Sequence, residues 1–275
     1  MGSHHARHLR EMGADLEVVD PALGLPEPAG LPDAAVIAVP SHLHLAVALP
    51  LLRQGVPCLI EKPLAADLSE GAQLARYPRL MVGHVERYNP ALSLLSGPLR
   101  FVQAERLAPY SGRAADVDVV LDLMIHDIDI FLASDPQDPL GGVQAEGLAV
   151  TSGQVDIAQA RLETVGGRVA TLSASRVSRT ASRRLRAFVA GEYWSLDLRE
   201  HRAHRVRWGE SLEEQAVEVP RWDALRRELE DFLAAVTEDQ PMPIPGEAGM
   251  DALRAAWLIQ DAIFRRGHPK RIVPG

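Results

Sequence analysis

Up to residue 90, short continuous apolar runs alternate with segments in which apolar residues recur at helical spacing. Two of these segments, Leu43–Gln54 and Asp67–Arg76, have the length of ordinary helices, and Gly55 after the first is a common helix stop. Strands buried on both faces appear as continuous apolar runs, and helices between them connect parallel strands. The pattern therefore predicts an α/β fold with a Rossmann-like, doubly wound parallel sheet. Its predicted strands are Leu16–Asp20, Ala35–Val39, Val56–Ile60 and Leu80–Val82.

After residue 98 most segments alternate apolar and polar residues, which is typical of strands with one buried face. The pair Gly166-Gly167 indicates a hairpin, and Ala190–Glu192 indicates a second turn. We therefore expect an α+β domain with a large, open, mostly antiparallel sheet. Its predicted strands are Leu99–Leu107, Val143–Val150, Val155–Thr164, Arg168–Ser175, Leu185–Ala190, Tyr193–Leu198 and Arg202–Trp208. Its predicted helices are Val117–Leu132, Trp222–Thr237 and Gly246–Arg266.

The change of pattern divides the chain into a domain at 1–97 and a domain at 98–275, with the C-terminal helices free to pack back on the first domain. A formal net charge of −8 argues against a nucleic-acid surface, and we place the basic run Arg176–Arg186 on a solvated sheet face. No apolar run reaches the roughly 18 residues that a membrane helix needs. A single cysteine, Cys58, excludes an internal disulfide and favours a cytoplasmic location.

The first candidate for chemistry is the triplet Glu61-Lys62-Pro63, which directly follows a predicted buried strand. Open α/β sheets bind ligands at the carboxyl ends of their strands, so these side chains are placed where a site would be. Charged residues also end many strands without any function. From the residues alone, both interpretations stay open.

The second candidate is the segment DVVLDLMIHDIDIFL, in which Asp122, His126 and Asp129 would share one helix face. The rest of that helix is apolar, so the three polar side chains need partners or a site. A satisfied structural network is the alternative. A metal site is not expected, because His4 and His8 stand in a charged helix and no cysteine cluster or HExxH motif supports one.

The order of these motifs resembles one family over nearly the whole chain. The motifs are a helix after Gly2, the strand-ending Asp20, then AVPSHLH, IEKPLA, GHVERYNP and DLMIHDID. Together they are similar to those of the glucose–fructose oxidoreductase/inositol dehydrogenase (Gfo/Idh/MocA) family of NAD(P)-dependent sugar dehydrogenases. The GHVERYNP stretch is most similar to the branch that acts on nucleotide-linked amino sugars, such as UDP-N-acetylglucosamine 3-dehydrogenases.

The resemblance implies catalytic roles for Lys62, Asp122 and His126. In this family the lysine lies beside the nicotinamide and the reacting hydroxyl, and the Asp–His pair reaches the same point from the second domain. A histidine with a pKa near its usual value of about 6.5 can take the hydroxyl proton. The lysine would stabilise the developing alkoxide, and Asp122 would anchor the histidine or the sugar. The resemblance also implies substrate contacts for Arg87, Tyr88, Asn89 and Asp129.

The same resemblance implies an NAD site. Asp20 would accept hydrogen bonds from the ribose hydroxyls, and its charge disfavours the 2′-phosphate of NADP. The residues expected at the cofactor are Gly2, Ser3, Asp20, Pro40, His44, Glu61 and Lys62.

The chain departs from the family at its start. Relatives begin with a strand and a G-x-G-x-x-G loop, of which only Met1-Gly2 has a counterpart here. We expect the missing strand, normally central in the sheet, to leave its neighbours unpaired. Either the reading frame begins upstream of Met1, or the protein is shortened and binds its cofactor poorly.

The leading hypothesis is an enzyme that transfers a hydride between NAD and a secondary hydroxyl of a sugar, cyclitol or sugar nucleotide. One alternative is a non-catalytic or cofactor-impaired relative that binds a sugar or a protein partner. Another is an imine or biliverdin-type reductase of the same fold. We expect no nucleic-acid or membrane partner, and a homodimer or homotetramer formed through the C-terminal sheet.

Overall fold

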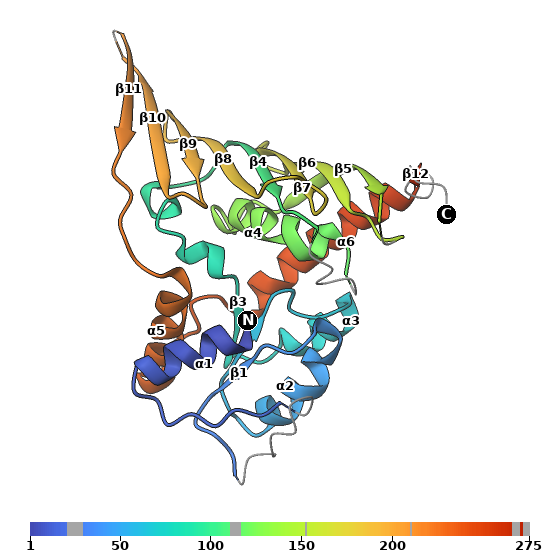
Figure 1. Cartoon of the computed structure of the whole chain (residues 1–275), viewed down its shortest axis with the longest axis vertical. Coiled ribbons are helices and arrows are strands. Elements are labelled where there is room, and N and C mark those ends of the chain that lie inside the picture. Colours follow the sequence, from blue (N-terminus) through green and yellow to red (C-terminus); the bar gives the residue numbers. More distant parts are fainter. Residues whose placement is uncertain (21–29, 111–116, 152, 210, 266–269, 272–275) are drawn as a thin grey trace. The chain divides into compact units, whose positions relative to one another are not determined.

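The computed structural model describes residues 1–20, 30–110, 117–151, 153–209, 211–265 and 270–271 (Figure 1). Its contacts divide the chain into two compact units. The first unit is Met1–Tyr88 with Asp223–Met250, and the second is Asn89–Trp222 with Asp251–Gly275. The division falls after Tyr88 rather than after residue 97, and the segment Asp223–Met250 belongs to the first unit.

The first unit contains a parallel sheet of three strands in the order β1-β2-β3. Strand β1 is Ala35–Ile37, β2 is Cys58–Glu61 and β3 is Leu80–Gly83. Every residue of β2 and β3 is buried, as their continuous apolar sequences predict. The helices of this unit are α1 (Gly2–Glu11), α2 (His44–Arg53), α3 (Leu68–Leu74) and α5 (Ala224–Thr237).

The predicted strand Leu16–Asp20 is wrong: these residues have no regular secondary structure. A strand forms only where a neighbour completes its hydrogen bonds. In the part of the chain that the structure describes, β1 pairs with β2 alone. No described strand therefore lies between β1 and Leu16–Asp20 to pair with both. In the described sheet, β1 is therefore an edge strand.

The second unit is built on a nine-stranded sheet in the order β11-β10-β9-β8-β4-β7-β6-β5-β12. Among the strands that the structure describes in this sheet, only the pairs β4–β7 and β5–β12 are parallel, so the predicted mostly antiparallel sheet is confirmed. Both predicted turns join neighbouring strands. The strands are β4 (Phe101–Leu107), β5 (Leu140–Ala149), β6 (Ile157–Thr164), β7 (Val169–Ser175), β8 (Ser182–Val189), β9 (Glu192–Asp197), β10 (Arg202–Trp208), β11 (Leu212–Val217) and β12 (Lys270–Arg271).

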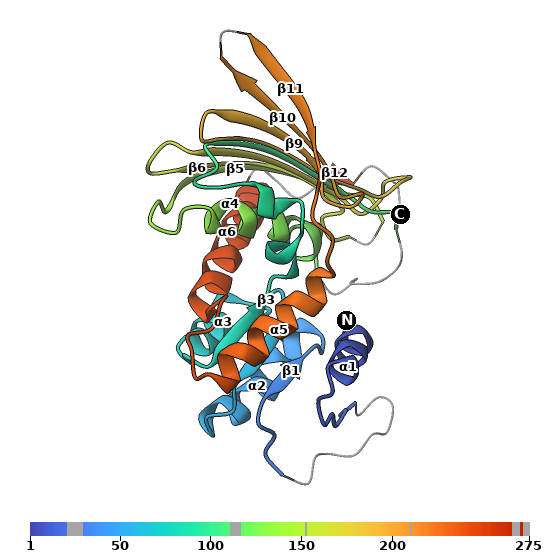
Figure 2. The same cartoon turned by 90° about the vertical axis from the view of Figure 1, so that its left-hand side faces the viewer.

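One face of this sheet packs on helices, as Figure 2 shows. A π-helical turn, Val120–Met124, leads into helix α4 (Ile125–Ala133), so the predicted single helix Val117–Leu132 is in two parts. Helix α6 (Gly246–Arg265) enters this unit at Asp251. No described helix covers the opposite face of the sheet.

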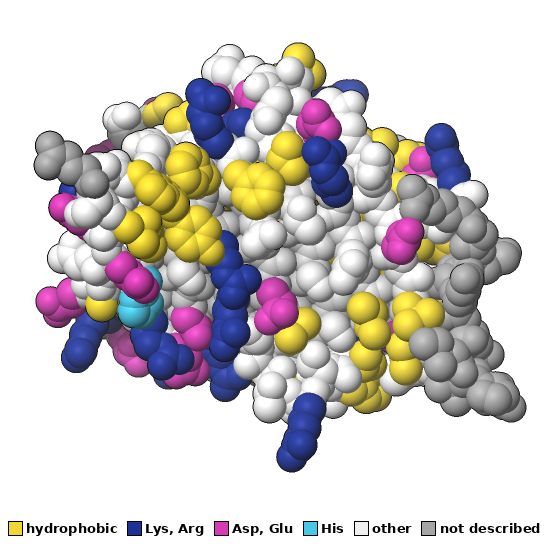
Figure 3. All heavy atoms as spheres, turned by 90° about the horizontal axis from the view of Figure 1, so that it is seen from above, with side chains coloured by type: hydrophobic (Ala, Val, Ile, Leu, Met, Phe, Trp, Pro, Cys, Tyr) yellow, Lys and Arg dark blue, Asp and Glu magenta, His cyan; other side chains and the backbone are white. Residues whose placement is uncertain are grey.

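The open face carries an apolar row that crosses five strands. Phe101 pairs laterally with Phe188 of β8, and the ring of Phe188 lies 5.8 Å from that of Trp208. Hydrophobic side chains gather on this face in Figure 3. We call the set the apolar row: Val169, Phe101, Phe188, Tyr193 and Val206.

Arg176 does not lie on the solvated face where the basic run predicted it. Its guanidinium is buried, and Nε donates to Asp156 Oδ1 at 2.7 Å. Among the helices that the structure describes, none has both the length and the apolar character that a membrane span requires.

Candidate functional site

The Glu61-Lys62-Pro63 triplet lies at the carboxyl end of β2, as predicted, and the Lys62–Pro63 peptide is cis. Glu61 pairs in register with Gly83, the last residue of β3. A Cβ atom at Gly83 would lie 3.3 Å from Glu61 Cα and 3.3 Å from the carbonyl oxygen of Ile60. The glycine therefore lets β3 approach the backbone that immediately precedes Lys62.

The side chain of Glu61 is held by a residue that the sequence analysis did not select. His5 Nε2 lies 2.6 Å from Glu61 Oε1, and both side chains are buried. A carboxylate only accepts hydrogen bonds, so Nε2 is the donor. His5 lies on the buried face of α1 with His8 and Leu9. His5, His8 and Leu9 have the i, i+3, i+4 spacing of one helix face, and this spacing is the sequence signal that distinguishes the buried His5 from the exposed His4.

Helix α1 directs its N-terminus to the same end of the sheet. A Cβ atom at Gly2 would lie 3.9 Å from Ala38 Cβ, directly after β1. The helix has ten residues, and no side chain of the described residues caps its first turn. Unpaired N–H groups and the helix dipole favour an anion at such an end. The backbone at Gly2 and Ser3 thus fits the pyrophosphate of a dinucleotide.

His44 connects the loops that follow β1 and β2. Its Nε2 lies 3.0 Å from the carbonyl oxygen of Val39, and its Nδ1 lies 3.2 Å from that of Leu64. Burial lowers the pKa of His44, although these carbonyl contacts act in the opposite direction. A neutral imidazole carries one N–H, so His44 donates to one of these two carbonyl oxygens, while its other ring nitrogen faces the second. Pro40, which precedes the turn leading to His44, is exposed. His44 fixes the shape of two loops at the strand ends.

The other predicted first-unit residues differ in their surroundings. Asp20 is partly exposed at the end of a segment without regular structure. Arg87 and Tyr88 lie in the 3-10 helix Val85–Tyr88. Burial raises the pKa of Tyr88 well above its usual range, and the negative charge and hydrogen bond of Asp231 on α5 add to this effect.

Asn89, the first residue of the second unit, has a clear structural role. Its side-chain amide donates to the carbonyl oxygen of Leu198 at 2.9 Å, and its Oδ1 accepts from the N–H of Ala91 at 3.0 Å. The side chain is buried. Its predicted contact with substrate stays a prediction.

In the second unit, Asp122 and His126 come from successive turns of one helical segment. Asp122 lies in the π-helical turn and His126 lies in the first turn of α4. Both are partly exposed, whereas Asp127 and Asp129 are buried. The segment therefore leaves Asp122 and His126 partly accessible and places Asp129 in the interior.

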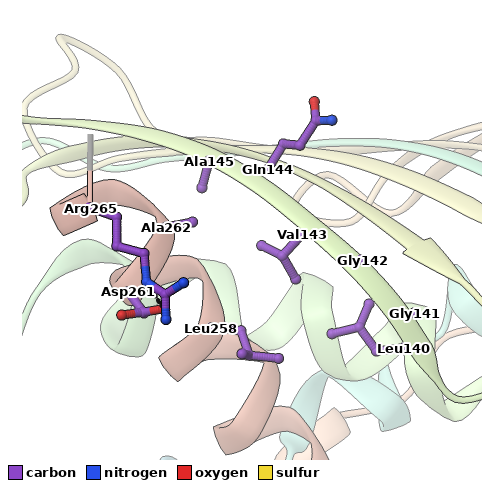
Figure 4. Close-up of a pocket in the computed structure, with 10 residues that line it drawn as sticks. All are labelled: Leu140, Gly141, Gly142, Val143, Gln144, Ala145, Leu258, Asp261, Ala262 and Arg265. Carbon is purple, nitrogen blue, oxygen red and sulfur yellow. Dashed lines mark ion pairs between the residues drawn. The ribbon is translucent and has the colours of Figure 1, made fainter.

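Two pockets of the second unit are lined by other residues. One of about 420 Å³ lies between β5 and α6, where Asp261 pairs with Arg265 at 2.8 Å (Figure 4). Another, of about 510 Å³, is lined by residues of β10, β11 and their flanks. No predicted site residue lines either pocket. Among the described residues no group of three or more His, Cys, Asp or Glu side chains could hold a metal ion.

Comparison with known proteins adds the biological context. Residues 2–79 match the profile of the oxidoreductase family with an NAD-binding Rossmann fold. A UDP-N-acetylglucosamine 3-dehydrogenase from Acidithiobacillus ferrooxidans is 37% identical over 247 residues, with 84% of this chain and 79% of that protein covered. An inositol 2-dehydrogenase from Corynebacterium glutamicum is 27% identical over 113 residues, which cover 36% of this chain and 34% of that protein.

Solved structures show the same relationship. The crystallised UDP-N-acetylglucosamine 3-dehydrogenase from A. ferrooxidans superposes with a TM-score of 0.80 at 35% identity, covering 94% of this chain and 86% of that one. An NAD-binding oxidoreductase from Klebsiella pneumoniae superposes with a TM-score of 0.78 at 15% identity, covering 96% and 86%. The second likeness concerns the fold alone.

Proposed function

Because the chain belongs to the Gfo/Idh/MocA oxidoreductase family with an NAD-binding Rossmann fold, we propose that it oxidises a secondary hydroxyl of a nucleotide-linked amino sugar, UDP-N-acetylglucosamine or a close relative. The observation that carries this substrate is the 37% identity to the UDP-N-acetylglucosamine 3-dehydrogenase over most of both chains. The presence of Lys62, Asp122 and His126 supports catalysis over a purely binding role.

NAD supplies the hydride acceptor, and the protein supplies the proton chemistry. We assign the removal of the hydroxyl proton to His126, whose partly exposed position leaves it within reach of a ligand. Lys62 would donate a hydrogen bond to the oxygen as negative charge develops on it. Asp122 would orient the histidine or a sugar hydroxyl. The products are a keto sugar nucleotide, NADH and a proton.

The described residues of the first unit fit the cofactor. The N-terminal turn of α1, with Gly2 and Ser3, would bind the pyrophosphate, and Asp20 would bind the adenosine ribose. Glu61 and Lys62 lie at the carboxyl end of β2, and Pro40 lies in the loop after β1; these residues would line the nicotinamide side of the proposed site. His44 supports these loops. The carboxylate of Asp20 supports NAD over NADP, a preference that parallel titrations with NADH and NADPH would test.

The proposal is tested by incubating the protein with NAD and UDP-N-acetylglucosamine and following NADH absorbance. UDP-glucose and myo-inositol serve as comparison substrates. We expect Lys62→Met to lower kcat by about 10²–10³-fold, as the loss of one alkoxide-stabilising donor does. We expect His126→Asn to lower it by about 10²–10⁴-fold, with a changed pH profile.

The matched control is His201→Asn, at an exposed turn position with φ of +49°, where asparagine is readily accommodated. It should leave kcat unchanged. Turnover of myo-inositol but not of the sugar nucleotide would refute the proposed substrate. Wild-type kcat in both Lys62→Met and His126→Asn would refute the assigned mechanism.

We further propose that two copies associate through the open face of the nine-stranded sheet. The apolar row places aromatic and β-branched side chains contiguously on that face, and Phe101 is 47% exposed. Contiguous exposed apolar surface of this kind marks an interaction site.

A cytoplasmic location is proposed from the single thiol, Cys58, which is buried in β2, where burial raises its pKa to about 12.

A further inference from the structure

A buried ion pair joins the sheet of the second unit to the helix that carries His126. Arg106 of β4 donates from Nε to Asp127 Oδ2 at 3.0 Å and from a terminal nitrogen to Oδ1 at 2.7 Å. The two side chains are only 3% and 4% exposed. This is the two-pronged geometry in which guanidinium and carboxylate planes fix each other's orientation.

The position of Arg106 is unusual for a charged residue. Along β4 the buried positions alternate, and Arg106 follows Val102 and Ala104 on the face that packs against the helix. A buried ion pair contributes little net stability, because the cost of desolvating two charges offsets their attraction. Apolar residues of similar size would hold the two elements together about as well. The pair's distinctive contribution is orientation.

We propose that Arg106 and Asp127 are positioning residues for the proposed dehydrogenation, fixing the rotation and axial position of the segment that presents Asp122 and His126. Asp127 is the direct neighbour of His126 in the first turn of α4. Apolar contacts tolerate small rotations and slips of a helix, whereas two parallel hydrogen bonds to one carboxylate do not. This inference rests on the proposed function.

Other polar contacts hold the two ends of this segment. Asp118 accepts from the N–H groups of Val120 and Leu121 at 3.0 and 3.1 Å, where the π-helical turn begins. Arg168 donates to the carbonyl oxygen of Phe131 at 3.1 Å, near the end of α4. The Arg106–Asp127 pair acts between these ends, where the π-helical turn becomes an α-helix. A shift at that junction moves His126 directly.

The test compares the double variant Arg106→Met/Asp127→Leu with the wild type. We expect it to fold, with a thermal midpoint close to that of the wild type, because both charges of the pair are removed together. We expect kcat with the sugar nucleotide to fall by about 10–100-fold, as small misplacements of catalytic groups do. The KM for NAD should stay unchanged, because the cofactor contacts belong to the first unit.

Arg106→Lys provides the second variant, should the double variant fail to fold. It keeps the charge but loses the two-pronged geometry, so kcat should be intermediate and the pH profile shifted. The matched control is Asp251→Asn/Arg254→Gln, which removes an exposed ion pair on α6 of the same unit. It should leave kcat and its pH profile unchanged. Wild-type kcat in either Arg106 variant would overturn the inference.

A readout without turnover separates this inference from the proposed function. The ring signal of His126 can be assigned by NMR through His126→Gln. It should shift or broaden in Arg106→Lys and stay unchanged in the control. If the wild type does not turn over the substrate, the proposed function fails and the NMR result alone decides the positioning role. An unchanged His126 signal in Arg106→Lys would refute it.

Discussion

The two sheets of this protein are built for different surroundings. In the first unit every position of β2 and β3 is buried, so side chains can meet a ligand only where the strands end. In the second unit strands such as β6 alternate buried and exposed positions, and one whole face remains open. The first sheet thus leaves its strand ends for the proposed site, and the second exposes the face through which we propose that two copies associate.

The same contrast decides how reactive groups are held. In the first unit, Lys62 follows a strand end whose last side chain, Glu61, is fixed by a histidine from α1. In the second unit, His126 stands on a helix whose orientation is set by an arginine from the sheet. A strand end is fixed mainly by backbone pairing, whereas a helix on an apolar sheet needs a directional contact to stop it from sliding.

The greatest change that we predict is in the Kd of self-association through the open face of the nine-stranded sheet. Replacing both Phe101 and Trp208 by lysine should raise the Kd of self-association by at least about a thousandfold, which corresponds to about 4 kcal/mol. Leu31→Lys introduces a lysine at an exposed apolar position of the first unit and should not change association. Sedimentation equilibrium measures the Kd. An unchanged Kd in the double variant would show that this face is not the contact surface.

The next effect tests the strand-end arrangement of the first unit. His5→Phe removes the donor to Glu61 and leaves a buried carboxylate with one hydrogen bond fewer. It should lower the free energy of unfolding by up to about 3 kcal/mol, measured by urea denaturation. His5→Gln places an amide N–H near the position of Nε2 and should recover most of the loss. If the two variants are equally stable, the His5–Glu61 contact contributes only packing.

The smallest effect concerns acid sensitivity in the second unit. Burial alone would raise the pKa of Asp156, but hydrogen bonds from the N–H of Thr151 and from Arg176 outweigh it and lower the pKa to about 2. A carboxyl with a lowered pKa stabilises the fold above its ordinary pKa of about 3.9 and loses this contribution as pH falls toward 2. We expect a loss of about 1–2 kcal/mol over that window.

Comparing Asp156→Asn with the wild type isolates this contribution. The variant should be less stable near neutral pH, and its free energy of unfolding should depend less on pH below about 4. Asp251→Asn, at an exposed aspartate, serves as the matched control. Equal pH dependence of Asp156→Asn and wild type would show that this carboxyl is not what makes the second unit sensitive to acid.

Local patterns in the sequence predicted most elements. The buried strands β2 and β3 follow from continuous apolar runs, and helix α3 begins after Asp67, whose carboxylate accepts from the N–H of Glu70 at 2.9 Å. Strand β11 was missed because it is exposed along almost its whole length, so its residues do not alternate in polarity. It exists because β10 offers a partner, which no pattern within residues 212–217 reveals.

The site divides in the same way. Glu61, Lys62, Asp122 and His126 were selected from their places in strand and helix patterns, and the resemblance supplied their roles. The sequence analysis did not select His5, Arg106 or Asp127. Each of them nevertheless occupies a position that the periodicity of its helix or strand places on the buried face. A polar residue at a position where the periodicity predicts an apolar one indicates a buried partner. The sequence does not identify that partner, because it lies far away along the chain.

The fold class, the family, and the strand end and helix that carry the proposed reactive groups could all be predicted from the amino-acid sequence. These depend on periodicity and short motifs, which act over a few neighbouring residues. Three features became visible only in the folded chain: Leu16–Asp20 is not a strand, Arg176 is buried, and Arg106 binds Asp127. Those outcomes require a partner brought close by folding, because backbone hydrogen bonds and buried charges are stable only when both halves are present.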